Sequence, residues 1–191
     1  MPSLKADFDE LRERIRQGRE LGAASFEPIY YLVFSPEKII EVKRQTPAWI
    51  ARLRQDGWSV QAFSIAEEII AIHRDDPRRS LWLMADRKQP FDWPRTNAAL
   101  ANALTSNNAL QRRLEFRLQE LQQEKNGLLL VTDLEALHPY MRIGAMEGQL
   151  QGQFRVPTIF LYPGERLGKT SLKFLGFYPP DGNYRSVHVG G

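Results

Sequence analysis

Apolar residues recur along the chain first with the period of a helix and then with that of a strand. Four near the start are spaced three or four positions apart, namely Leu4, Phe8, Leu11 and Ile15. This spacing predicts an amphipathic helix that ends near Gly22. The run PIYYLVF at residues 28–34 comes next, and a short apolar run rich in aromatic and β-branched residues is typical of a buried strand.

A second helix and a second strand are predicted next. Ser35 can cap the helix, and Pro36 suits its first position. The expected buried face of this helix consists of Ile39, Ile40, Trp49, Ile50 and Leu53. Pro47 should kink or restart it, because proline has no N–H for the helix ladder. Residues 58–63 then form the second strand, and a helical crossover makes it parallel to the first in one sheet.

The pattern continues with helices through the middle of the chain. Ser64 and Glu67 form a capping box that opens a third helix. Its apolar side is expected to hold Ile65, Ile69, Ile70 and Ile72. Residues 80–84 are predicted as a short strand, and the proline-containing segment 87–96 as a loop. Helices are expected at 98–104 and over a longer segment whose buried positions are Leu110, Leu114, Leu118 and Leu121.

Strands dominate the predicted C-terminal half. Residues 128–131 form a buried strand, and the capping box at 132–135 should open a helix. Pro163-Gly164 is predicted as a turn. Further strands are expected at 156–162, 171–175 and 184–189. The alternation predicts a single α/β domain over residues 1–191, with a mostly parallel sheet flanked by helices, a nucleotide-binding doubly wound shape without a phosphate loop, and a C-terminal hairpin.

Composition and charge narrow the class of protein. Hydrophobic residues make up 42% and charged residues 26% of the chain, which is ordinary for a globular domain. The absence of cysteine excludes disulfides, thiolate metal sites and a cysteine nucleophile. The charged start predicts no secretory signal, and no apolar run is long enough to span a membrane, so we expect a cytoplasmic protein. The net charge of +3 permits contact with DNA but does not argue for it.

The segment 163–170, PGERLGKT, partly matches a phosphate-binding loop of the form GxxxxGK[ST]. Pro163 replaces the first glycine, and the residues after the segment have the pattern of a strand rather than of a helix. A working loop needs a helix whose N-terminus holds the phosphates. We therefore interpret this segment as a degenerate, non-functional match within a hairpin. A nucleotide enzyme using Gly168, Lys169, Thr170 and Asp133 remains the alternative, and a helix after Thr170 would favour it.

A second candidate is the acidic end of the strand at 128–131. Asp133 and Glu135 could hold Mg²⁺ beside a nucleotide, although helix capping explains them equally well. The segment 34–38, where a phosphate loop belongs, contains no glycine. The three histidines, His73, His138 and His188, lack metal-ligand spacing. We assign no catalytic, cofactor-binding or metal-binding residues and expect no cofactor.

The C-terminal third carries a family resemblance. VPTIFLYPG at 156–164, LKFLG at 172–176 and NYR at 183–185 together resemble the BrxB family of the BREX bacteriophage-defence systems. YYLVFSP at 30–36, DGW at 56–58 and the strand at 128–133 are similar to that family as well. Relatives often have two tyrosines before the final arginine, whereas this chain has only Tyr184.

The resemblance implies a non-catalytic component of a BREX-like antiphage system. Such a protein would act in the host cytoplasm as a scaffold or adaptor that binds a PglZ-type, alkaline-phosphatase-like partner, beside a methyltransferase and a large ATPase. The alternative is a nucleotide-binding or DNA-binding subunit of the same kind of complex, the latter through its arginine-bearing helices.

The end of the chain is predicted to complete the fold rather than to serve as a docking peptide. Four large side chains near the end suggest a segment held against the core: Leu172, Phe174, Phe177 and Tyr184. Chain ends fray unless they are tied down in this way. Truncation before Ser171 should then give insoluble or unfolded protein.

Overall fold

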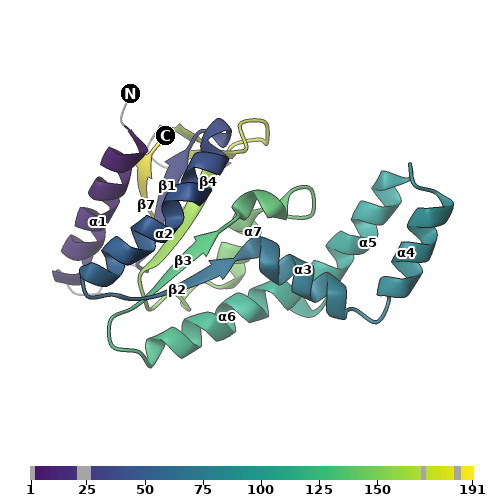
Figure 1. The fold of residues 1–191 in the computed structure, drawn as a ribbon, viewed down its shortest axis with the longest axis horizontal. Helices are drawn as coiled ribbons and strands as arrows, with labels where there is room; N and C mark the ends of the chain where they lie inside the picture. The colour runs from purple at the N-terminus through teal and green to yellow at the C-terminus, as the bar shows by residue number, and fades with distance from the viewer. Residues whose placement is uncertain (1–2, 21–26, 169–170, 183–185) are drawn as a thin grey trace.

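The computed structural model describes residues 3–20, 27–168, 171–182 and 186–191, with the side chains of 19, 20 and 147 outside that description. Five strands form a parallel sheet in the order β2-β3-β4-β1-β7 (Figure 1). Their bounds are Ile29–Phe34 for β1, Ser59–Ser64 for β2, Gly127–Thr132 for β3, Thr158–Leu167 for β4 and Val187–Gly190 for β7. The predicted mostly parallel α/β fold is confirmed.

The strand register brings the carboxyl ends of the parallel strands to one edge of the sheet. Ile29 pairs with Thr158 and Phe34 with Pro163, while Ser64 pairs with Thr132. The strands β1 and β2 lie parallel in one sheet as predicted, with β3 and β4 between them. All six residues of β1 are buried, which explains its continuous apolar run.

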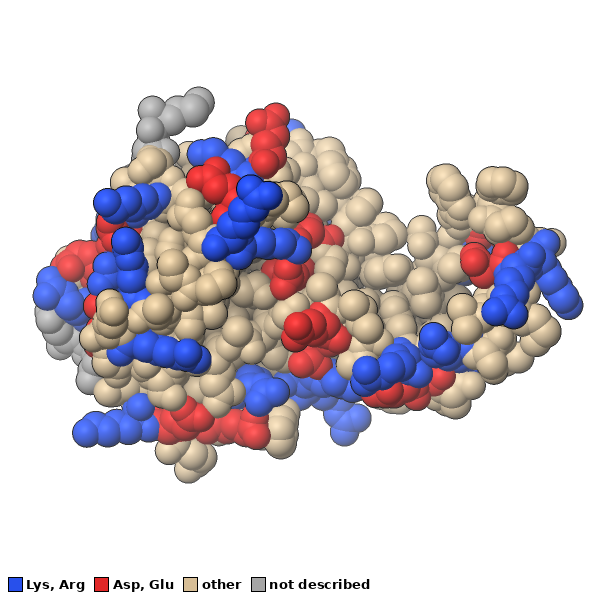
Figure 2. All heavy atoms as spheres, viewed as in Figure 1, with Lys and Arg blue, Asp and Glu red and all other residues tan. Residues whose placement is uncertain are grey.

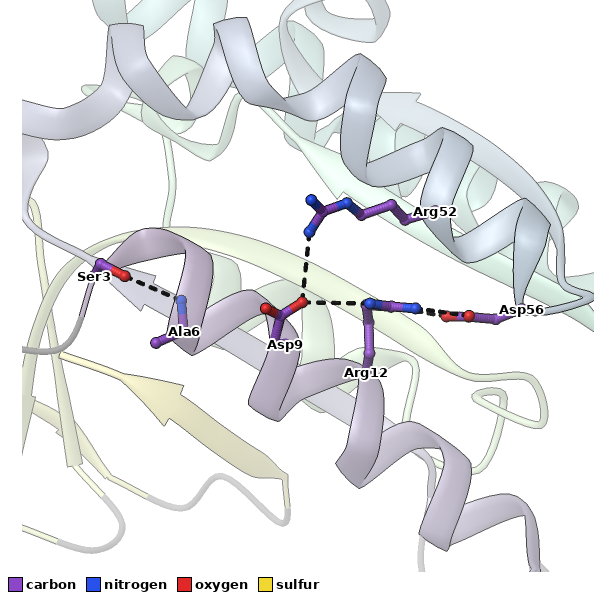
Figure 3. A network of polar contacts seen from close by, with 6 residues as sticks. All are labelled: Ser3, Ala6, Asp9, Arg12, Arg52 and Asp56. Atoms are coloured by element: carbon purple, nitrogen blue, oxygen red, sulfur yellow. Dashed lines mark hydrogen bonds and ion pairs between the residues drawn. The ribbon is translucent and has the colours of Figure 1, made fainter.

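Two helices cover one face of the sheet (Figure 1). They are α1, Leu4–Glu20, and α2, Ile39–Gln55, with the 3₁₀ turn Pro36–Lys38 leading into α2. The predicted stripe of α1 is buried, and the rings of Phe8 and Trp49 stack with centroids 4.7 Å apart. Arg12 joins the two helices through a bidentate ion pair with Asp56 (Figure 3). The predicted helix end at Gly22 lies outside the described residues.

One residue predicted for the buried face of α2 is placed wrongly. Ile40 is 59% exposed, because the buried face follows Val42, Trp49 and Leu53 instead. The helix runs through Pro47 without a restart. Since Pro47 and Lys43 lie on the exposed side, water can bond the Lys43 carbonyl that loses its N–H partner.

The opposite face is covered by α3, α6 and a shorter helix (Figure 1). Their bounds are Ile65–Asp75 for α3, Ala109–Gln122 for α6 and Ile143–Gln149 for α7. The four leucines predicted to be buried in α6 are fully buried. Ser64 caps α3 by accepting a hydrogen bond from the Glu67 N–H at 3.3 Å, as predicted. Ile70, however, is 62% exposed, because Ile65, Ile69 and Ile72 alone define the packed side.

The middle of the chain contains two helices, of which the second includes the helix predicted at 98–104 and the first replaces a predicted strand. They are α4, Arg79–Lys88, and α5, Trp93–Thr105, and they form an arm that projects beyond the sheet (Figure 1). The strand predicted at 80–84 is wrong, since its apolar residues lie on a projecting helix. The loop predicted at 87–96 spans only Gln89–Asp92 between the helices. Asp92 accepts a hydrogen bond from the Arg95 N–H and Pro94 occupies the first turn, so the prolines mark a helix start.

The C-terminal segment adds a hairpin and the last parallel strand. The strands β5, Ser171–Phe174, and β6, Asp181–Gly182, extend antiparallel from β4. The turn predicted at Pro163-Gly164 is wrong, because β4 runs straight through both residues. Gly164 is needed for close approach: a Cβ there would overlap the Lys173 carbonyl oxygen of β5. Among the described residues, no helix is long and apolar enough to cross a bilayer.

Candidate functional site

The acidic candidates Asp133 and Glu135 lie where β3 reaches the carboxyl edge of the sheet. The ammonium group of Lys43, on α2, is 2.7 Å from Asp133 Oδ1 and 2.6 Å from Glu135 Oε1. The hydroxyls of Ser64 and Thr132 each donate to Asp133 Oδ2 at 2.7 Å. Ligands of doubly wound folds bind at this edge, and here the cluster itself supplies a cation.

The local backbone explains this cluster. Asp133 has a positive φ of 59°, which turns the chain sharply at the end of β3. The predicted capping box does not form, because the Thr132 hydroxyl bonds the neighbouring carboxylate instead of capping a helix. A four-residue 3₁₀ turn, Leu134–Leu137, takes the place of the predicted helix.

Hydrogen bonds determine the charge state of the cluster. Burial alone would raise the pKa of Asp133, but the hydrogen bonds from Lys43, Ser64 and Thr132 outweigh it and lower that pKa. Burial likewise acts to lower the pKa of Lys43, and its two carboxylate partners raise it instead. Both groups are therefore held in their charged forms.

The space beside this cluster is small. Phe34, Lys43 and Leu161 help to line a cavity of about 20 Å³, which is roughly room for one water. The structure thus brings together the two predicted acidic residues, with an ammonium group where a cation would sit. The ion pairs of Lys43 with Asp133 and Glu135 connect α2 to the end of β3. Within the described residues, no cluster of three or more side chains is suited to hold a metal ion.

The partial phosphate-loop match lies in the β4–β5 hairpin. Gly168 has a φ of 69° at the hairpin turn, while Lys169 and Thr170 lie outside the described residues. The element after Thr170 is the strand β5. A strand at this position lacks the helix N-terminus that would hold phosphates, so the geometry opposes a nucleotide site here.

The histidines lie in three different environments. His138 bonds the Tyr178 hydroxyl at 2.6 Å rather than the acidic cluster. His73 bonds the Leu100 carbonyl at 3.1 Å and so links α3 to α5. His188 is buried in β7, where its ring meets that of Tyr31 edge-on. None of these arrangements is a metal site among the residues described.

The α4–α5 arm carries a surface that the sequence pattern did not predict. Within the described chain, no residue of α4 is buried. Five large apolar side chains of the arm are exposed: Leu81, Leu83, Met84, Phe91 and Trp93. Phe91 is 87% exposed at the loop between the helices. Exposed apolar groups gathered on one projecting element are typical of a contact surface for another protein.

The two helices of the arm border a groove of about 260 Å³, which is far more than the cavity of about 20 Å³ at the sheet edge. Its lining comes from regularly spaced positions of both helices and from the residues that flank them: Arg78, Leu81, Trp82, Ala85 and Gln89, with Asp92, Arg95, Thr96 and Ala99. Spacings of three and four along α4 could have revealed this helix in the sequence. The short apolar run at 80–84 was instead interpreted as a strand.

Comparison with known protein families gives a match over about the C-terminal two thirds of the chain. The model of the family described as BREX protein BrxB matches residues 69–189. The chain belongs to the BrxB family. The BrxB match begins within α3 and includes the α4–α5 arm, the strands β3 and β4 and the C-terminal hairpin. No curated protein and no solved structure gave a match.

Membership of the BrxB family confirms the resemblance found in the sequence and places the chain in the BREX phage-defence systems. The motifs at 156–164 and 172–176 lie within the matched segment, whereas those at 30–36 and 56–58 precede it. The family also implies association with other BREX components.

Proposed function

We propose that this protein is a non-catalytic scaffold or adaptor of a BREX complex and that it binds a PglZ-type, alkaline-phosphatase-like partner in the cytoplasm. BrxB membership supplies the BREX setting. The observation that carries the adaptor role is the exposed apolar surface of the α4–α5 arm. The sheet-edge cluster supports the same interpretation, since Asp133 and Glu135 are engaged by Lys43.

The shape of the arm suits an adaptor. It stands clear of the sheet (Figure 1), so a partner can reach both helices without contacting the rest of the molecule. His73 and Trp82 pack edge-to-face with ring centroids 6.0 Å apart, so α4 contacts α3 at this point. A projecting element with exposed apolar side chains offers a partner a surface to bury.

Co-purification tests this function. A tagged form of the full chain is expressed together with the neighbouring BREX genes and isolated at moderate salt. We expect a PglZ-type subunit to be recovered in a stoichiometric complex. Recovery of the tagged chain alone, from cells in which the PglZ-type subunit is soluble and abundant, would contradict the proposal.

A further inference from the structure

The groove between α4 and α5 is long enough for a short helix. Its α4 wall runs from Arg78 to Gln89, about 16 Å at 1.5 Å per residue. Leu81, Trp82 and Ala85 form an apolar stripe on this wall, and Ala99 faces them from α5. An amphipathic helix of about three turns, laying its apolar side into such a groove, is a recurring mode of recognition.

The groove and the hollow beside it carry more cationic than anionic side chains, with Arg78, Lys88 and Arg95 against Asp92. Residues 79–105 contain four arginines and lysines and two aspartates, so the arm contributes much of the net charge of +3. Arg95 lines the groove, and Lys88 joins it in lining an adjoining hollow that shares Leu81, Ala85 and Gln89 with the groove. Within the described chain neither the Lys88 nor the Arg95 side chain has an ion-pair partner. Arg78 differs, since it pairs with Asp76 at 2.9 Å and lies over the Trp82 ring. Figure 2 shows Lys and Arg beside a smaller acidic area toward the outer end of the arm.

We propose that the groove between α4 and α5 binds an acidic amphipathic helix of the partner protein. Apolar residues of that helix, three and four positions apart, would cover Leu81 and Trp82, and its Asp or Glu side chains would pair with Lys88 and Arg95. This inference rests on the proposed adaptor function and names the contact surface and the chemistry of its occupant.

Two other occupants fit the groove less well. A second copy of the chain, meeting arm to arm, would bring together two segments that each carry four cationic and only two anionic residues, and like net charges disfavour association. Duplex DNA would contact Lys88 and Arg95 with its phosphate groups. It would leave Leu81, Met84 and Phe91 exposed, and these residues are what distinguish the arm from an ordinary basic surface.

Site-specific crosslinking identifies the occupant. The chain has no cysteine, so Ala85→Cys introduces a single thiol in the groove for a photoactivatable maleimide. Phe116→Cys, at an exposed position of α6 outside the arm, is the matched control. The complex with the PglZ-type subunit is irradiated, and the crosslinked segment is identified by mass spectrometry. We expect a crosslink from the groove to a helical segment with an excess of Asp and Glu, and none from the control.

Surface variants test the two parts of the contact separately. Leu81→Glu removes apolar contact, and the double variant Lys88→Glu with Arg95→Glu reverses the charge at these two positions. Each should weaken the complex by about tenfold or more, as loss of a central contact does. Phe116→Glu and Lys125→Glu, at exposed positions of α6 and the loop after it, should leave affinity unchanged. Every substituted site is exposed, and unchanged melting temperatures show that the variants fold.

The outcomes separate this inference from the adaptor function. If the wild-type chain recovers no BREX partner, both fail. If a partner is recovered but tolerates both groove variants, or crosslinks to the groove through a basic or non-helical segment, only the helix-in-groove inference fails. It also fails if Ala85→Cys crosslinks only to a second copy, or if the groove variants weaken duplex DNA binding in a mobility-shift assay while leaving the protein complex intact.

Discussion

Lys43 and Asp133 connect the two sides of the sheet through an ion pair of 2.7 Å. Lys43 belongs to α2, which covers one face, whereas the segment after Asp133 packs against the other face through Leu134 and Leu137. The pair therefore holds together two chain segments that leave the sheet edge in opposite directions. In doubly wound folds, ligands bind at the point where connecting segments diverge in this way. In this chain the Lys43 side chain occupies that point.

Removal of the ammonium group should weaken the fold modestly. Lys43→Met keeps the apolar stem but leaves Asp133 and Glu135 without their shared cation. We expect a loss of roughly 1 kcal/mol in the free energy of unfolding near pH 7, measured with urea. Because the pKa of Asp133 is lowered, its contribution is present above its ordinary value of 3.8 and is lost as pH falls through its folded-state pKa. The difference between variant and parent should therefore shrink in acid. An equal loss in Lys125→Met would contradict a specific role for Lys43.

His188 should make the protein less stable in mild acid. Burial, with a smaller contribution from Arg166, lowers its pKa from 6.5 to about 4. Between these two values the unfolded chain binds a proton that the folded chain does not, so stability is full above pH 6.5 and falls as the pH is lowered toward 4. His188→Phe keeps a ring beside Tyr31 and should flatten the melting temperature across this window. An unchanged slope in His188→Phe would show that other groups control the acid response.

Truncation before Ser171 should abolish cooperative folding. It removes β5 and β7 and exposes the core around Leu172, Phe174 and Val189, all of which are buried. Each large apolar side chain contributes roughly 1.5–3 kcal/mol when buried, so losing several exceeds much of a domain's net stability. Insoluble protein, or a soluble form without a thermal transition, is the expected result. A truncated form that melts like the full chain but no longer binds its partner would show that the segment serves binding.

Two residues of that segment show where the tail prediction needs correction. Phe177 is 61% exposed and stacks on Tyr178 at the surface, so it does not belong to the core. Tyr184 lies outside the described residues. The prediction that Leu172 and Phe174 are held against the core is confirmed, and both face the same side because every second residue of a strand does so.

The sequence was most informative where burial leaves a continuous signal. The runs of β1 and β3 are buried on both faces and were correctly predicted as strands. The helix α4 was missed because Leu81, Leu83 and Met84, which pack against no core, fall in a short apolar run that resembles a strand. Strand order, however, could not be predicted from these runs. Leu129 and Phe160 are apolar and buried like their neighbours, so their residue types do not indicate which strand lies beside each.

The ion pair between Asp133 and Lys43 could not be predicted from local sequence patterns either. The two residues are distant in sequence, and they come together only because α2, which connects β1 to β2, packs near the end of β3. The acidic residues could be identified as candidates from their place after a buried strand. Their partner could not, because Lys43 lies on the exposed side of a helix where lysine is common.

The position of β1 also has a consequence for protein synthesis. β1 pairs with β4 and β7, so Tyr30 lies between Ile159 and Val187. β1 is synthesised early, and it stays unpaired until β4 and β7 leave the ribosome. Pairings of such long sequence separation form slowly, and an uncovered β1 is prone to aggregate in the interval. Overproduction should thus depend on chaperones and temperature more strongly than the stability of the finished fold would suggest.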